Sequence, residues 1–244
     1  MIVCYFWPFV SLIVAELIKQ WIKQKKVSVE ESLATLFKVI DNVVGKKSER
    51  FAGFASNYTK ESPQKDVFSE ITQPDLQIEK LAEAVALFFE STKGSQSLSF
   101  RVALAEMGNK YIHKFICFYP YDKPITGKLV AYQKDNCGFT KAKKLKKMVL
   151  VADISKESQK TKNRSFVSTP GRSNIGSMIV YPVFHRGNKE VVYCLSVLCS
   201  EPNYFSSDKR EFFEDIMSKF ATRIELEYSL KLIKEQYNEC CAVA

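Results

Sequence analysis

The stretch from Ser177 to Cys199 reads SMIVYPVFHRGNKEVVYCLSVLC and decides what kind of fold the chain can form. Two apolar runs, rich in valine and other strand-favouring residues, lie on either side of Arg-Gly-Asn-Lys. Glycine adopts positive φ angles at little cost, so Gly187-Asn188 predicts a tight turn and the stretch predicts a β-hairpin. The stretch has no paired nucleophile and base and no metal or phosphate motif. We therefore interpret it as one wall of a sheet.

Three more strands and two helices are predicted around this hairpin. Residues 100–105 alternate between apolar and other residues, residues 111–118 return after a Gly-Asn turn, and residues 148–152 form a short strand that ends at Asp153. A helical pattern of apolar residues precedes the strands, and a second one follows from Ser206 or Ser207. This order predicts an α+β fold: an antiparallel sheet of about five strands with the N- and C-terminal helices packed on one face.

In this order, residues 75–233 resemble a GAF domain, a small sensor module. The resemblance depends on VLVADISK (149–156), on NIGSMIVYPVFHRGNKEVVYCLSVLCSEPNYFSSDKREFFEDI (174–216) and on the helix after it. It implies a central sheet with a ligand pocket on one face and the first and last helices on the other. In such domains these helices commonly pair in dimers, and the segment between the middle strands roofs the pocket. The cyclic-nucleotide motif and the bilin attachment site of the characterised subclasses are not found, so the resemblance names no ligand or cofactor.

The net charge of +9 is concentrated in that roof. Residues 121–172 contain thirteen Lys and Arg against four Asp and Glu, so this segment alone accounts for the whole excess. Such a roof suits an anionic ligand, a nucleotide for example, and forked donors and hydroxyls fit phosphate better than lysine does. The ligand contacts are therefore predicted at Arg164, Ser165, Arg172, Ser173 and Asn174. The alternative is a solvated loop whose charge only aids solubility.

The lysine run KAKKLKK (141–147) has two further interpretations. It could lie on anionic lipid, or it could simply be solvated. Nucleic acid is a weaker interpretation, because only Phe139 offers an aromatic ring for stacking near the run.

The N-terminus suggests a membrane anchor. Residues 2–18 are apolar except for Pro8, Ser11 and Glu16, and Lys19, Lys23, Lys25 and Lys26 follow at once. A run of this length with a positive flank predicts a transmembrane helix within residues 1–26, with the following domain on the cytoplasmic side. The alternative is a buried helix of a soluble protein.

Residues 27–62 form the next predicted element, an amphipathic or coiled-coil helix. Ser28 and Glu31 fit a capping box, and the apolar positions then recur in steps of four and three with one polar interruption. The helix could pack on its own domain or pair with a second copy to make a homodimer. The seam comprises Leu33, Phe37, Ile40, Val44, Lys47, Phe51, Phe54 and Tyr58.

No catalytic or metal site is predicted. The seven cysteines have no regular spacing, which favours a reducing compartment, and the carboxylates of the basic segment are not paired. The terminal CAVA (241–244) matches a prenylation signal, but a match of four residues is common by chance. Residues 234–244 are expected to be a flexible tail. The leading hypothesis is a non-enzymatic, membrane-anchored sensor of a small anionic ligand that signals through helical dimer contacts. The alternative is an adaptor that dimerises with an empty pocket.

Overall fold

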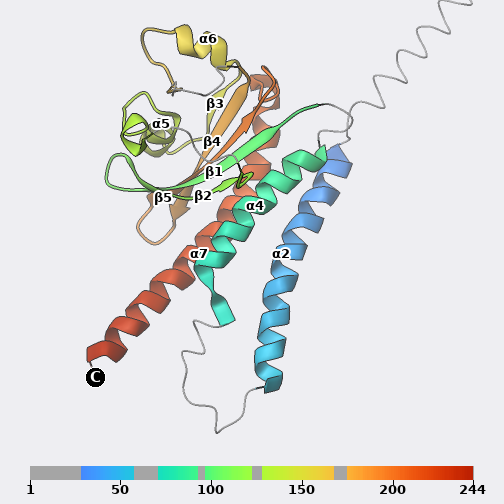
Figure 1. Cartoon of the computed structure of the whole chain (residues 1–244), viewed down its shortest axis with the longest axis vertical. Helices are drawn as coiled ribbons and strands as arrows, with labels where there is room; N and C mark the ends of the chain where they lie inside the picture. The colour runs from blue at the N-terminus through green and yellow to red at the C-terminus, as the bar shows by residue number, and fades with distance from the viewer. Residues whose placement is uncertain (1–28, 58–70, 93–96, 123–127, 168–174, 244) are drawn as a thin grey trace, which may run out of the picture.

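The structure is a computed structural model, and it describes residues 29–57, 71–92, 97–122, 128–167 and 175–243. Two long helices precede the first hairpin, short helices surround the third strand, and one long helix closes the chain (Figure 1). The elements in order are α2 (Val29–Asn57), α4 (Pro74–Thr92), β1 (Phe100–Met107), β2 (Ile112–Tyr119), η2 (Leu129–Ala131), α5 (Gly138–Leu145), β3 (Val149–Val151), α6 (Ile154–Gln159), β4 (Ser177–His185), β5 (Glu190–Cys199), η3 (Ser207–Lys209) and α7 (Arg210–Val243).

The five strands form one antiparallel sheet in the order β2-β1-β5-β4-β3. The hairpin of β4 and β5 occupies the middle of this sheet, because β5 also pairs with β1 along most of its length. A central position on both faces explains why both strands are almost continuously apolar. The predicted α+β fold and its five-stranded antiparallel sheet are confirmed.

The first face of the sheet packs against α4 and α7, as predicted for the N- and C-terminal helices. Side chains at alternate positions of β1 and β5, such as Leu104 and Leu195, are fully buried in this core. Aromatic rings join the helices, since the ring centroids of Phe88 and Phe220 lie 6.3 Å apart. Most of the largest fully buried side chains among the described residues therefore belong to this core.

The second face is covered by α5, α6 and the segment of residues 160–167. Phe139, Ile154 and Phe166 pack here in a second, smaller core. A Cβ atom on Gly138 would lie 3.1 Å from both Met178 Cε and the Ser165 backbone oxygen, so glycine lets α5 lie close to β4. The described part of the basic segment is thus anchored on the sheet by apolar contacts.

Helix α2 packs on α4, on the side away from the sheet (Figure 1). The predicted heptad seam is divided between two sides of α2: Ile40 is buried, whereas Phe37, Val44 and Phe51 are 62%, 40% and 44% exposed. Packing on the domain selects a neighbouring row that the sequence analysis did not single out, which includes Leu36.

Two local expectations differ from the structure. In the β4–β5 hairpin, the positive φ angle belongs to Lys189 (φ 57°) rather than to Gly187, because the turn spans the four residues between His185 and Glu190. Helix α7 continues to Val243, so residues 234–243, expected as a flexible tail, are helical. The division of the chain into domains stays a prediction.

The predicted membrane-associated location is contradicted by the structure. Within the described ranges, none of the helices combines the length and the apolar composition needed to cross a bilayer. The segment proposed as the anchor, residues 1–26, lies outside the described residues.

Candidate functional site

A small open area on the second face of the sheet is the candidate site. Ala103 of β1 pairs with Ser196 of β5, and the two are 9% and 8% exposed, whereas Leu104, Ala105 and Leu195 around them are fully buried. Both side chains are short, so they extend less far from the backbone than the large side chains around them, and a small part of each residue is accessible to solvent. The Ser196 hydroxyl donates a hydrogen bond to the Ala103 backbone oxygen (3.3 Å).

Three larger side chains surround this pair, and the register of the strands places them. Arg101 lies two residues before Ala103 on the same face and pairs with Leu198, while Phe118 of β2 pairs with Ala103. Arg101 is exposed, and Phe118 and Leu198 are half-buried. We call the five residues the sheet floor. It combines an apolar surface, one hydroxyl and one guanidinium group, which is the mixture that small-ligand sites commonly have.

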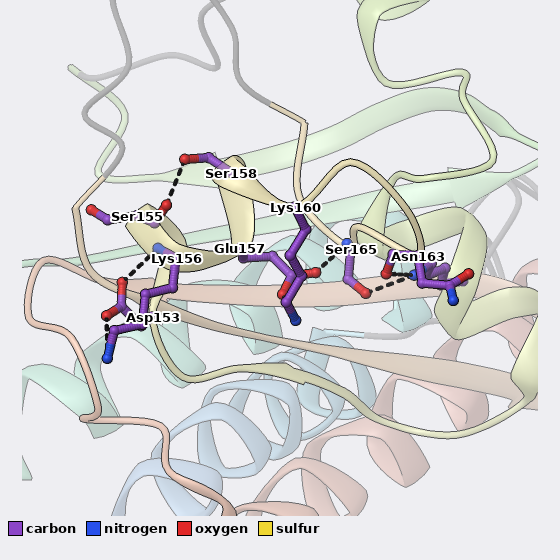
Figure 2. A network of polar contacts seen from close by, with 9 residues as sticks. Asp153, Ser155, Lys156, Glu157, Ser158, Lys160, Asn163 and Ser165 are labelled. Carbon is purple, nitrogen blue, oxygen red and sulfur yellow. Dashed lines mark hydrogen bonds and ion pairs between the residues drawn. The ribbon is translucent and has the colours of Figure 1, made fainter.

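We call α6 and the residues after it, 154–167, the covering segment; a network of hydrogen bonds holds it together (Figure 2) and joins it to α5. The Glu157 carboxylate accepts from the Ser165 backbone N–H (2.5 Å) and from Lys160 Nζ (2.6 Å). Lys141 Nζ of α5 donates to the Ser165 hydroxyl (2.9 Å) and to the Asn163 backbone oxygen (2.5 Å). We call these five residues the roof network.

The roof network lies beside β4 and close to the floor. The Ser165 backbone oxygen is near Gly138, which also faces the side chains of Met178 and Val180. Val180 is paired with Ser196 in the sheet. The roof network therefore lies on the side of β4, the strand next to β5, which carries Ser196.

The charge on Glu157 is stabilised despite the burial of its side chain. Burial raises the pKa of this carboxyl group, but the hydrogen bonds from Lys160 and Ser165 and the charges of Lys160 and Lys141 outweigh burial. The pKa of Glu157 therefore lies below its ordinary value. Asp153, whose carboxylate caps α6 by accepting from the Lys156 backbone N–H, also has a lowered pKa, mainly because of this hydrogen bond.

Replacing Glu157 with glutamine should change the pH dependence of stability. A carboxyl group with a lowered folded-state pKa contributes stability above its unfolded-state pKa and loses that contribution as the pH falls through the folded-state value. We expect Glu157→Gln to be less stable than the wild type at pH 7 and to approach it at pH 3, as measured by urea unfolding. The exposed Glu201→Gln is the control. A difference between Glu157→Gln and wild type that is constant with pH would contradict this role.

The structure describes two of the five predicted ligand residues. Arg164 Nη1 donates to the Ser158 backbone oxygen (3.3 Å), and Ser165 belongs to the roof network. Both are held by contacts within the covering segment, and Glu157 supplies an acid close to them. Arg172, Ser173 and Asn174 lie outside the described residues.

The sequence analysis missed the sheet floor. Arg101 and Ser196 are polar residues within largely apolar strands, but β1 also contains Glu106 and β5 contains Glu190, so the signal for a site at these positions was weak. Their proximity depends on the pairing of β1 with β5, two strands about ninety residues apart in the chain.

Three of the described cysteines are not reactive thiolates, and the described residues show no metal site. Burial raises the pKa of Cys117 to about 12 and that of Cys199 to about 11, and it also raises the pKa of Cys194. These three thiols are therefore protonated at neutral pH. In the ranges that the structure covers, no group of three His, Cys, Asp or Glu side chains is placed to hold a metal ion.

Comparisons with known proteins agree with the predicted resemblance at the level of the fold. No protein-family model matches the chain, and no curated protein matches it in sequence. Among solved structures, the GAF domain of an Acinetobacter phosphoenolpyruvate-protein phosphotransferase is 14% identical, with 81% of this chain and 94% of that chain covered and a TM-score of 0.46. Residues 122–287 of a methyl-accepting chemotaxis protein are also 14% identical, with coverages of 78% and 99% and a TM-score of 0.46. The fold is GAF-like, and the likeness at these identities concerns the fold alone.

The prediction that the chain is not an enzyme is contradicted by the comparisons, because enzymes are among the similar solved structures. Similar structures also include the type II free methionine-R-sulfoxide reductase from Thermoplasma acidophilum, which is 13% identical, with 62% of this chain and 94% of that chain covered and a TM-score of 0.44.

Proposed function

We propose that this chain is a sensor whose GAF-like domain binds a small anionic ligand on the sheet floor. The observation that carries the proposal is the pair of short side chains Ala103 and Ser196 in the middle of the sheet, next to the exposed Arg101 and the half-buried Phe118 and Leu198 on the same face. The exposed guanidinium of Arg101 on the same face gives the ligand its charge preference.

The covering segment supplies the remaining contacts in this proposal. Arg164 uses one nitrogen for the Ser158 carbonyl, so its other N–H groups are available for an anion. Ser165 and Lys141 are held in place by the roof network, which lowers the entropic cost of binding. We propose Arg172, Ser173 and Asn174, from the adjoining part of the chain, as the other contacts.

Occupancy would reach the helices through β1 and β5. The floor residues alternate along these strands with Val102, Leu104, Leu195 and Val197, which are buried against the core formed with α4 and α7. A ligand that displaces either strand therefore changes the packing of the helices. It shifts the population of two helical arrangements only if it binds them with different affinities. We propose that dimer contacts of the helices pass on this difference.

Filling the floor should abolish binding. We expect Ala103→Leu to remove the thermal stabilisation that a bound ligand gives the wild type, because the leucine side chain would occupy the position that the ligand takes beside Ser196. The measurement is the unfolding temperature with and without inorganic phosphate, AMP, GMP, ATP and GTP, together with native mass spectrometry of the purified full chain. Arg101→Gln should weaken binding of the anion, whereas Lys209→Gln, which removes an exposed cation of η3, should not.

The experiment also separates the sensor from the adaptor. A wild-type chain that shows no shift with any of these compounds and carries no co-purified ligand would favour an adaptor with an empty pocket. Unchanged ligand binding by Ala103→Leu would move the site away from the sheet floor and contradict the proposal.

A further inference from the structure

Helix α2 carries two apolar seams, of which its own domain uses one. The inner seam recurs in steps of four and three and faces the domain, where Leu36, Ile40 and Val43 are buried and Lys47 pairs with Glu227 of α7. A second seam with the same spacing lies one residue further along the chain at each position, which places it about 100° around the helix from the inner seam. From Val44 it continues through Asp41, Phe37 and Ala34 in one direction and through Ser48, Phe51 and Ala55 in the other, and all seven residues are exposed.

The outer seam is unusual for a helix surface facing water. Phe37 is 62% exposed and Phe51 44%, and the small residues between them let another backbone lie close. Gly45, beside the seam, has no atom within 4 Å of where a Cβ would lie, so its glycine is not required by packing within this chain. Glycine in the middle of a helix costs roughly 0.5–1 kcal/mol relative to alanine. A regular heptad of exposed apolar residues is the pattern that binds a second helix.

The residue types of the outer seam are arranged symmetrically about Val44. On either side of Val44 comes first a short polar residue, then phenylalanine, then alanine. If a second α2 lies antiparallel across Val44, a two-fold axis places Phe37 opposite Phe51 and Asp41 opposite Ser48. The Ser48 hydroxyl can then donate to the Asp41 carboxylate, which would otherwise face apolar surface. An interface that pairs a patch with itself in this way is what a two-fold dimer requires.

The charges beside the seam obey the same symmetry. Lys38 lies six residues before Val44 and Glu49 five residues after it, on the same flank of the helix and both exposed. Neither forms an ion pair with the residues that the structure describes. The two-fold axis brings Lys38 of each copy near Glu49 of the other, which gives two complementary pairs. A parallel arrangement would instead place Asp41 opposite Asp41, a repulsive contact.

We propose that the outer seam of α2 binds the same seam of a second copy of this chain, antiparallel about a two-fold axis at Val44. From Ala34 to Ala55 the seam extends over about 32 Å of helix, at about 1.5 Å per residue. The inference deepens the dimeric part of the proposed function, on which it rests, and is independent of whether a ligand binds the sheet floor.

Opposite charges at the two phenylalanines test both the surface and the orientation. In sedimentation velocity of the full chain, we expect Phe37→Lys and Phe51→Glu each to weaken the dimer by at least about tenfold, because each places an unpaired charge in the seam. The double variant Phe37→Lys/Phe51→Glu should regain the dimer, since the antiparallel pairing places each lysine opposite a glutamate. Leu87→Lys on α4, at a side chain that is 44% exposed, is the control and should leave the dimer unchanged.

Three outcomes would overturn the inference. A wild-type chain that is monomeric at 100 µM (about the concentration such contacts need) excludes this dimer, and dimerisation insensitive to both single substitutions excludes this surface. A double variant as weakly associated as the single variants excludes the antiparallel orientation, because a parallel pair would face like charges at both positions. All substituted side chains are exposed in one chain, so circular dichroism should show unchanged helix content. A dimer that responds as expected while no ligand binds leaves this inference intact and refutes only the ligand-binding part of the proposed function.

Discussion

Gly176→Ala is expected to destabilise the chain strongly. Gly176 has a φ angle of 119°, where side chains are strained, and an added Cβ would lie 2.1 Å from the Cys199 backbone oxygen. Backbone strain and overpacking each cost about 1–3 kcal/mol, so together about 2–6 kcal/mol of the free energy of unfolding is lost. Natural domains have only about 5–15 kcal/mol in total. The fall in the urea midpoint, measured on the full chain, checks this value.

The position explains why no small adjustment relieves the contact. The Gly176 carbonyl accepts the Ile154 backbone N–H (2.8 Å), and the next residue, Ser177, donates its hydroxyl to the Glu201 backbone oxygen (2.8 Å). The start of β4 is thus fixed to both α6 and the end of β5. Gly53→Ala is the matched control, because no atom lies within 4 Å of its Cβ position in α2, and it should raise stability by roughly 0.5–1 kcal/mol. Equal effects of the two substitutions would refute the argument.

Lys47→Ala is expected to have the second large effect, centred on α2. Lys47 Nζ donates to both oxygens of the Glu227 carboxylate, at 2.6 and 2.8 Å, and the Glu227 side chain is only 6% exposed. Removing the lysine leaves a buried carboxylate without its counter-charge, which costs about 3 kcal/mol. Urea unfolding should show this loss, and hydrogen exchange should locate it as faster exchange in α2.

A double substitution separates the ion pair from the packing. Lys47→Met/Glu227→Leu removes both charges and fills the same space, so it should be close to the wild type in stability or above it. If Lys47→Ala is as stable as the wild type, the pair is solvated in solution and does not hold α2 on the domain. If the double variant is as unstable as Lys47→Ala, an unpaired buried charge is not the cause of the loss, because the double variant contains neither charge.

Much of the fold could be predicted from local patterns. The runs in β4 and β5 and the alternation in β1 are visible within about ten residues each, because side chains on a strand alternate between two environments. The helical period of α4 and α7 is equally local. These patterns also supported the resemblance to a GAF domain, which the fold confirms.

The candidate site could not be predicted in the same way. Arg101 and Ser196 lie on separate strands, and only the pairing of β1 with β5 brings them to one face. The predicted contacts Arg164 and Ser165 were chosen for their chemistry, but the structure shows both engaged within the covering segment. The high content of Lys and Arg identified the basic segment from the sequence. The hydrogen-bond and ion-pair partners of its charged side chains could be found only from the folded chain.

The sequence by itself determined the five strands, the long helices, their order, and the heptad spacing along α2, because these follow from the period of apolar residues along the chain; the short helices α5 and α6 were not predicted. Tertiary structure alone decided which side of α2 is buried, where solvent reaches the sheet, and why Gly176 must lack a side chain. These properties depend on neighbours that are distant in sequence, such as Glu227 for Lys47 and Cys199 for Gly176. A local pattern allows several surfaces to be buried, and tertiary packing decides which of them is. The same packing determines which residues form the candidate site on the sheet.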